Sequence, residues 1–197
     1  MRLVVGLGNV GKRYKLTRHN FGFLALQSFA KEDDIVFKKE KNFLICKHQN
    51  FALVKPTTFM NDSGLAVVSA INYYKFEDLL VISDDVNLPF GKIKVKKSGS
   101  SGGHRGLGSI EKHLGSRDFN RLRFGVGGGD LKHLSNYVLS GFTAEQKRKL
   151  PAVFSFTSLL IRQFVSNGIE SMIEFFSREQ TAYSKLVSLE SLKTKGE

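Results

Sequence analysis

A histidine and an aspartate that lie far apart in the sequence are the residues best suited to acid–base chemistry. His19 stands in a polar stretch just before a predicted helix, and an imidazole titrates close to neutral pH. Asp84 ends a predicted buried strand, and open α/β sheets bind ligands at the carboxyl ends of their strands. With its imidazole oriented by the Asp84 carboxylate, His19 could act as a general base. The alternatives are a structural or solvated histidine and an aspartate in a turn or a helix cap.

Two further side chains with chemical potential follow the strand that Pro56 ends. Asn61 could orient a water molecule or donate a hydrogen bond to a carbonyl oxygen on which charge develops. Phe59 could stack on a nucleic acid base. A capping asparagine and a buried phenylalanine are the structural alternatives for these two positions.

Cationic side chains in the middle of the chain favour a phosphate ligand. Residues 102–106 form a glycine-bracketed His-Arg pair that opens a predicted helix, where backbone N–H groups and Arg105 would bind a phosphate. Lys96 and Arg123 lie on neighbouring predicted strands and could clamp a backbone phosphate. The chain carries 30 Lys+Arg against 18 Asp+Glu, a formal net charge of +12, which favours a nucleic acid partner. A solvated basic face is the alternative.

Other reaction classes find less support in the sequence. Gly6, Gly8 and Gly11 match the spacing of the dinucleotide-binding fingerprint, but the helical pattern that should start at once begins only near Phe21. The five histidines show no H-E-x-x-H spacing, and the single cysteine, Cys46, excludes a disulfide framework and a multi-cysteine zinc site. A dinucleotide-dependent enzyme therefore remains only a distant alternative.

The elements that must position these residues alternate between strands and helices. Apolar runs and alternating patterns predict strands, and apolar residues at helical spacing predict helices. The predicted strands cover residues 2–7, 35–39, 43–47, 51–55, 79–83, 92–97 and 121–126. The predicted helices cover residues 20–32, with Asn20 near the cap, 62–75, 107–114 and two segments within 143–177.

This order of elements predicts an α/β fold: a single globular domain with a twisted mixed β-sheet surrounded by helices. Residues 1–180 would form the domain and residues 181–197 a polar C-terminal tail. Pro151 is expected at the start of a helix, where its missing N–H is tolerated. The sequence holds no apolar run of about 18 residues and does not begin with a secretion leader, so we expect a soluble cytoplasmic protein without membrane association.

Four segments together resemble the bacterial peptidyl-tRNA hydrolases and occur in that family's order. They are VVGLGNVGKRYKLTRHNFGF (4–23), KPTTFMNDSGLAV (55–67), ISDDVNLPFGKIKVKKSGSSGGHRGLGSI (82–110) and FNRLRFGVG (119–127). The resemblance extends from residue 3 to about residue 142, and the C-terminal third matches only as helices. It implies hydrolysis of the ester between a peptide and the 3′-terminal ribose of tRNA, by a cytosolic monomer that needs no metal or organic cofactor.

The resemblance also implies roles for single residues of the catalytic centre. His19 would be the general base that activates water, and Asp84 would hold its imidazole and stabilise the charged form. Asn9 would contact the peptide backbone and help reject aminoacyl-tRNA that has a free amino group. Asn61 would position the water and the scissile carbonyl.

For the tRNA, the resemblance implies that Tyr14 and Phe59 contact its end, and that Lys96 and Arg123 clamp its 5′-phosphate. Members of the family usually have asparagine where this chain has Arg105, which would instead hold a phosphate. The chain also departs from the pattern at Asn87, where an acidic residue is common, and in a serine-rich stretch where glycine is usual. A non-catalytic RNA-binding relative is the main alternative, and the joint presence of the four catalytic candidates argues against it.

Overall fold

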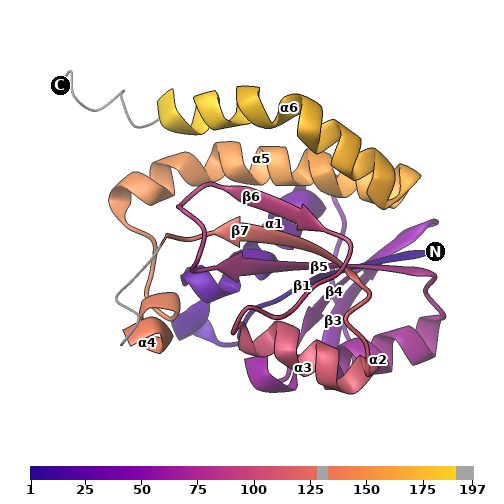
Figure 1. Cartoon of the computed structure of the whole chain (residues 1–197). Coiled ribbons are helices and arrows are strands. Elements are labelled where there is room, and N and C mark those ends of the chain that lie inside the picture. Colours follow the sequence, from indigo (N-terminus) through magenta and orange to yellow (C-terminus); the bar gives the residue numbers. More distant parts are fainter. Residues whose placement is uncertain (128–132, 190–197) are drawn as a thin grey trace.

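A computed structural model describes residues 1–127 and 133–189, and its framework is a seven-stranded mixed β-sheet (Figure 1). The strands lie in the order β2-β3-β4-β1-β5-β7-β6. Their bounds are β1 (Arg2–Gly6), β2 (Lys38–Lys39), β3 (Phe43–Lys47), β4 (Phe51–Pro56), β5 (Asp78–Asp85), β6 (Ile93–Lys96) and β7 (Asn120–Gly125). The expected fold class, one domain with a mixed sheet surrounded by helices, is confirmed.

Parallel pairing in the centre of the sheet determines where the chemistry-bearing loops meet. Strand β1 pairs in parallel with β4 and β5, and β5 pairs in parallel with β7. Only the edges are antiparallel, at β2-β3-β4 and at β6-β7. The carboxyl ends of β1, β4, β5 and β7 therefore open on the same edge of the sheet.

Helices cover both faces of this sheet. Helices α1 and α5 pack on one face, with α6 outside α5, and α2 and α3 lie on the other face (Figure 1). The described helices are α1 (Phe21–Glu32), α2 (Ser63–Tyr74), α3 (Arg105–Leu114), α4 (Leu134–Val138), α5 (Ala144–Asn167) and α6 (Ile169–Leu189). Within the described residues, none of these helices is both long and apolar enough to cross a membrane.

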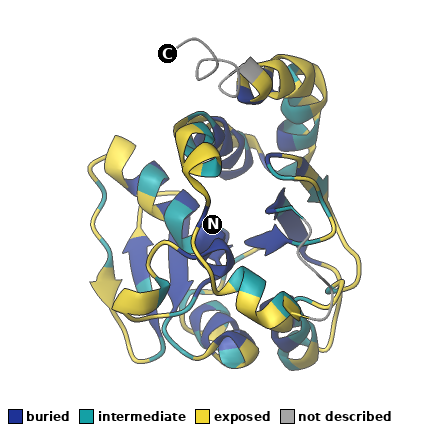
Figure 2. Ribbon diagram, turned by 90° about the vertical axis from the view of Figure 1, so that its left-hand side faces the viewer, coloured by how far each residue is buried: buried dark blue, intermediate teal, exposed yellow. Residues whose placement is uncertain are grey.

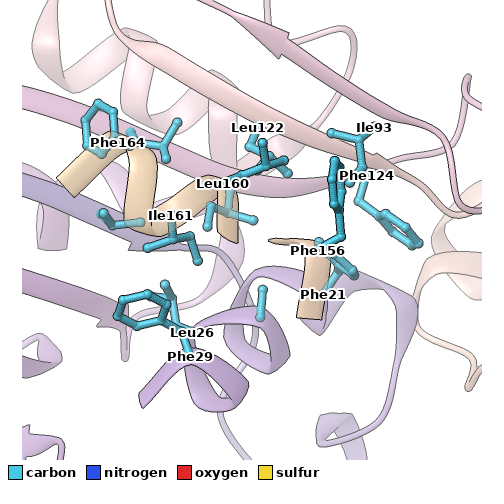
Figure 3. Packing of buried hydrophobic residues seen from close by; sticks show 14 of the residues in the cluster. Phe21, Leu26, Phe29, Ile93, Leu122, Phe124, Phe156, Leu160, Ile161 and Phe164 are labelled. Atoms are coloured by element: carbon cyan, nitrogen blue, oxygen red, sulfur yellow. The ribbon is translucent and has the colours of Figure 1, made fainter. Parts of the chain in front are cut away.

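The core consists of two apolar layers, one on each face of the sheet. Residues along β5 alternate between them: Leu80 and Ile82 join the layer under α1 and α5, while Leu79 and Val81 join the layer over α2 and α3. In the first layer, Phe21 stacks on Phe124 with 3.9 Å between ring centroids (Figure 3). The central strands are buried, as the dark blue strands in Figure 2 show. This burial explains why their sequences are nearly continuous apolar runs.

Helix α5 begins earlier than the position of Pro151 predicts. Thr143 Oγ1 accepts a hydrogen bond from the N–H of Gln146, and the Gln146 side chain accepts one from the N–H of Thr143. This capping box starts the helix at Ala144, so the predicted start at Pro151 is wrong and the proline lies inside α5. Pro151 has no N–H to donate to the carbonyl of Lys147, four residues earlier. Both residues are exposed, so water can bond to this carbonyl instead.

The polar tail expected from residue 181 is helical over its first part. Helix α6 continues to Leu189, and Tyr183 stacks on Phe156 at 4.3 Å and donates a hydrogen bond to the carbonyl of Gly91 at 2.7 Å. Burial raises the pKa of the Tyr183 phenol above its ordinary value. The buried side chains of Tyr183 and Val187 therefore hold this largely polar segment on the domain; residues 190–197 lie outside the described part of the chain.

Candidate active site

A cleft of about 290 Å³ lies at the edge where the parallel strands end. The cleft is formed by the segments that follow β1, β4 and β5, by the start of α3, by β7 and by α4. All the site residues expected from the sequence except Lys96 line it: Asn9, Tyr14, His19, Phe59, Asn61, Asp84, Arg105 and Arg123. Six separate parts of the sequence thus meet in one place.

The centre of the cleft is a buried pair formed by His19 and Asp84. His19 lies on the short 3-10 turn η2 (Arg18–Asn20), and its Nδ1 is 2.9 Å from Asp84 Oδ1. The side chain of His19 is 10% exposed and that of Asp84 only 2%. Because Asp84 occupies Nδ1, the nitrogen of His19 that is left for a proton from the cleft is Nε2.

A second histidine, His104, completes the surroundings of Asp84. Its Nε2 is 3.0 Å from the same oxygen, Asp84 Oδ1, and its ring lies 4.8 Å from that of His19. On the other side of the ring, Nδ1 accepts hydrogen bonds from the N–H groups of Gly106 and Leu107 and caps α3. An acceptor at Nδ1 carries no proton in the neutral ring, so the proton is on Nε2, which donates to Asp84.

The two histidines set the protonation state of Asp84. Burial alone raises the pKa of its carboxyl, but the charge interactions and hydrogen bonds of His104 and His19 outweigh burial and hold that pKa well below its usual range. Asp84 therefore remains a carboxylate that two N–H donors share. Such a carboxylate fixes the tautomer of His19 and stabilises an imidazolium that forms during a reaction.

This cluster is built as a hydrogen-bond network and not as a metal centre. His19, Asp84 and His104 are a described group whose potential ligand atoms all lie within 4.8 Å of one another. A metal ligand needs a free nitrogen lone pair, yet His104 Nε2 carries the proton because Nδ1 accepts from two backbone amides. Metal binding at Nε2 would require giving up the cap of α3.

Asn9 is held in place by a residue that the sequence suggested only as a helix cap. The Asn9 N–H donates to Asn20 Oδ1 at 2.7 Å, and Asn20 Nδ2 donates to the Asn9 carbonyl at 2.9 Å. The Asn20 side chain makes no capping hydrogen bond to α1. Its two bonds instead fix the backbone of Asn9, which leaves the Asn9 side chain free to face a ligand.

The loop after β4 presents its aromatic residue to solvent. Phe59 is 77% exposed, so the alternative of a buried phenylalanine is wrong. Asn61 is exposed too and lies in the 3-10 turn η3 (Met60–Asp62), which leads into α2. An exposed aromatic ring at the edge of a cleft is suited to stacking on a planar ligand group.

The cations lie on one side of the cleft and continue beyond it. Arg123 Nε is 3.1 Å from Asp85 Oδ2, and Arg105 is exposed at the first residue of α3. Gly102 has a φ of +59° and its backbone lies against the Arg123 guanidinium, where a side chain would collide with it. Lys96 projects from β6 onto the same face of the sheet as Arg123 but outside the cleft, directly across from Arg121.

Three features of the site were not predicted from the sequence. The 102–106 segment was recognised as an anion-binding candidate, but the bond from His104 to Asp84 was missed, as was the contact of Asn20 with Asn9. A histidine directly before a helix is the signal that could have indicated the cap. Helix α4, which forms one wall of the cleft, was also not predicted, because its five residues are too few for a helical pattern to stand out.

Comparison with known proteins gives consistent matches over most of the chain. The family model described as peptidyl-tRNA hydrolase matches residues 3–184. The peptidyl-tRNA hydrolase of Thermodesulfovibrio yellowstonii is 40% identical over 186 residues, covering 90% of this chain and 100% of that protein. The one from Leuconostoc mesenteroides is 42% identical over 177 residues, covering 85% and 94%. A crystal structure of peptidyl-tRNA hydrolase from Acinetobacter baumannii superposes with a TM-score of 0.76 at 30% identity, covering 87% of this chain and 94% of that one.

Proposed function

The chain belongs to the peptidyl-tRNA hydrolase family, whose enzymes cleave the ester between a peptide and tRNA, and we propose that His19 is the general base of this cleavage. The observation that carries the proposal is the 2.9 Å contact between His19 Nδ1 and the buried Asp84 carboxylate inside the cleft. It leaves His19 Nε2 as the acceptor for a proton of water. A non-catalytic RNA-binding relative is not favoured, because such a protein has no use for a buried imidazole–carboxylate pair in a cleft.

The reaction needs no protein nucleophile, because an ester is reactive enough for water and a general base. Water attacks the carbonyl carbon while its proton moves to His19 Nε2, and Asp84 stabilises the imidazolium that forms. The tetrahedral intermediate collapses by breaking the bond to the ribose oxygen, which takes the proton back from His19. The products are a free carboxylic acid and tRNA with an intact 3′-terminal ribose, and the base is regenerated.

Two asparagines are positioned to recognise the acyl half of the substrate. Asn61 would donate a hydrogen bond to the carbonyl oxygen as negative charge develops on it, which is the role of an oxyanion donor. Asn9 would pair with the first amide of the peptide. An aminoacyl-tRNA has an ammonium group there, whose desolvation in the cleft is costly without an acceptor. This difference favours peptidyl-tRNA over aminoacyl-tRNA.

The remaining residues would hold the tRNA by its backbone and its terminal base. Phe59 and Tyr14 would contact the end of the acceptor strand, with Phe59 stacked on a base. Arg105 would bind a phosphate of this end, and Lys96 with Arg123 would clamp the 5′-phosphate. Phosphate contacts of this kind are independent of base sequence, as a general tRNA enzyme requires.

A direct test follows the release of tRNA from N-acetyl-aminoacyl-tRNA by the purified protein. We expect turnover with this substrate and at least roughly tenfold lower kcat/KM with the same aminoacyl-tRNA lacking the acetyl group, because of the desolvation cost. Failure to cleave the blocked ester would rule out the proposed function. From the resemblance to the family, we further propose that the enzyme acts as a monomer, in the cytoplasm where tRNA is used.

Removing either member of the clamp is expected to weaken tRNA binding without stopping the chemistry. For Lys96→Ala and Arg123→Ala, the slope of log Kd against log salt concentration should decrease by about one for each lost phosphate contact. Lys38→Ala is the matched control, since it removes the same charge from β2, the opposite edge strand of the sheet. A salt slope that stays unchanged in both clamp variants would contradict the assignment.

A further inference from the structure

Helix α4 forms a wall of the cleft although it has almost no core of its own. Leu134, Ser135 and Val138 of α4, and Leu139 after it, line the cleft, yet α4 contains no fully buried residue. A helix of this length is not stable by itself in water. Contacts from elsewhere in the protein must therefore hold it beside the catalytic pair.

The main contact comes from Arg18, the residue next to the base. The Arg18 side chain is buried, and its Nη1 donates to Ser140 Oγ at 2.6 Å and to the Tyr137 carbonyl at 3.4 Å. Its Nη2 donates to Gln146 Oε1 at 2.9 Å, and the guanidinium lies over the Tyr137 ring at 4.3 Å. One side chain thus joins the end of α4, the segment after it and the first turn of α5.

Two more contacts hold the same corner. The Arg18 N–H donates to the Ser140 carbonyl at 3.1 Å, and the Tyr137 hydroxyl donates at 2.7 Å to the carbonyl of Val126, the residue directly after β7. Each of the three residues of η2 therefore holds a different part of the site: Arg18 holds α4, His19 meets Asp84, and Asn20 holds Asn9.

We propose that Arg18 is a positioning residue for the hydrolysis, which holds α4 as the wall against which the acyl group of the substrate binds. The inference rests on the proposed function. The residues that α4 and its end contribute to the cleft are uncharged and mostly apolar, whereas Arg105 and Arg123 are the arginines that line the cleft among residues 1–127 and 133–189. Phosphates would bind on the cationic side, which leaves the apolar wall for amino acid side chains of the peptide.

The test compares two acyl groups on the same RNA minihelix, N-acetyl-phenylalanyl and N-acetyl-glycyl. Lysine has a single nitrogen in place of the guanidinium fork, so Arg18→Lys keeps the charge but cannot meet Ser140, Tyr137 and Gln146 together. We expect the KM of Arg18→Lys for the phenylalanyl ester to rise roughly tenfold, the loss of about one charge-assisted hydrogen bond. The kcat and the KM for the glycyl ester should change little.

A second variant acts on α4 from the other side and keeps the test independent of how Arg18→Lys folds. Tyr137→Phe removes the hydrogen bond to Val126 and should also raise the KM for the phenylalanyl ester selectively. Because both changes act through α4, their effects should be less than additive in the double variant. Arg162→Lys is the matched control: Arg162 lies on α5 but pairs with Glu32 and Asp33 on the far side, so its KM values should equal those of the wild type.

The outcomes separate the inference from the function on which it rests. Wild-type protein that cleaves neither ester would remove the proposed function itself. Wild-type cleavage together with a loss of kcat in Arg18→Lys and Tyr137→Phe, or with equal KM changes for both esters, would overturn the role of Arg18 in acyl binding. Selective KM changes for the larger acyl group, with kcat retained, would establish it.

Discussion

Replacing His19 with alanine is expected to reduce kcat for N-acetyl-aminoacyl-tRNA at least about a hundredfold, the usual contribution of a positioned general base. The variant loses the nitrogen that takes the proton of water, while the cations and Phe59 that would hold the tRNA remain. We therefore expect the Kd for tRNA to stay close to the wild-type value. Single-turnover cleavage at saturating enzyme measures the chemical step, and fluorescence anisotropy of labelled tRNA measures binding.

The matched control for this experiment is His48→Ala. His48 is an exposed histidine in the turn between β3 and β4, stacked on Phe51, and it lies outside the cleft. Its replacement should leave kcat unchanged. Equal activity of the wild type and His19→Ala would remove His19 from the mechanism, and a parallel loss of tRNA binding would show that the substitution disturbs more than the base.

Asp84→Asn is expected to reduce kcat by roughly a hundredfold or more, by analogy with the loss that follows when the carboxylate of a His–Asp pair becomes an amide. The asparagine keeps the shape but not the negative charge that stabilises the imidazolium. Because His104 and His19 hold the pKa of Asp84 well below its usual range, the wild-type carboxylate stays ionised down to about pH 5 and lower. Acid inactivation of the wild type above that pH should therefore not come from Asp84.

Asp78→Asn provides the matched control on the same strand. Asp78 begins β5, at the opposite end from Asp84, and accepts hydrogen bonds from the Leu79 N–H and from Asn120 Nδ2. The same isosteric change at this position is expected to affect stability but not kcat. Retention of more than a tenth of the wild-type kcat in Asp84→Asn would contradict the proposed role of the carboxylate.

The sequence was most informative where a functional residue ends a regular element. Asp84 ends an apolar run that is buried on both sides, and the parallel pairing of β5 with β1 brings the ends of these strands together. His19 lies in the segment that follows β1, and the carboxyl end of β1 opens on the same edge of the sheet. The sequence also predicted that Lys96 and Arg123 lie on neighbouring strands, and the register of β6 and β7 places both on one face of the sheet.

Contacts between distant segments could not be predicted in this way. Arg18 contacts the end of α4 and the segment after it, more than a hundred positions away in the sequence. No local sequence pattern indicates that these two segments come together. Pro151 was misleading for the opposite reason. Its local preference for the first turn of a helix was overridden by the capping box at Thr143, eight positions earlier, and water can bond to the carbonyl that lacks an N–H partner. Local preference sets the kind of element, while tertiary contacts set its limits.

The double hydrogen bonding of His104 couples the stability of a helix end to the charge state of the reaction centre. Ordinary capping residues accept through a short side chain, whereas position 104 must accept on one atom and donate on another across the width of a ring. When the first turn of α3 opens, Asp84 loses the hydrogen bond from His104, and His19 is then paired with a carboxylate that lacks its second donor. Local opening of this turn costs less free energy than unfolding of the whole domain. We therefore expect moderate denaturant to reduce turnover before the sheet unfolds.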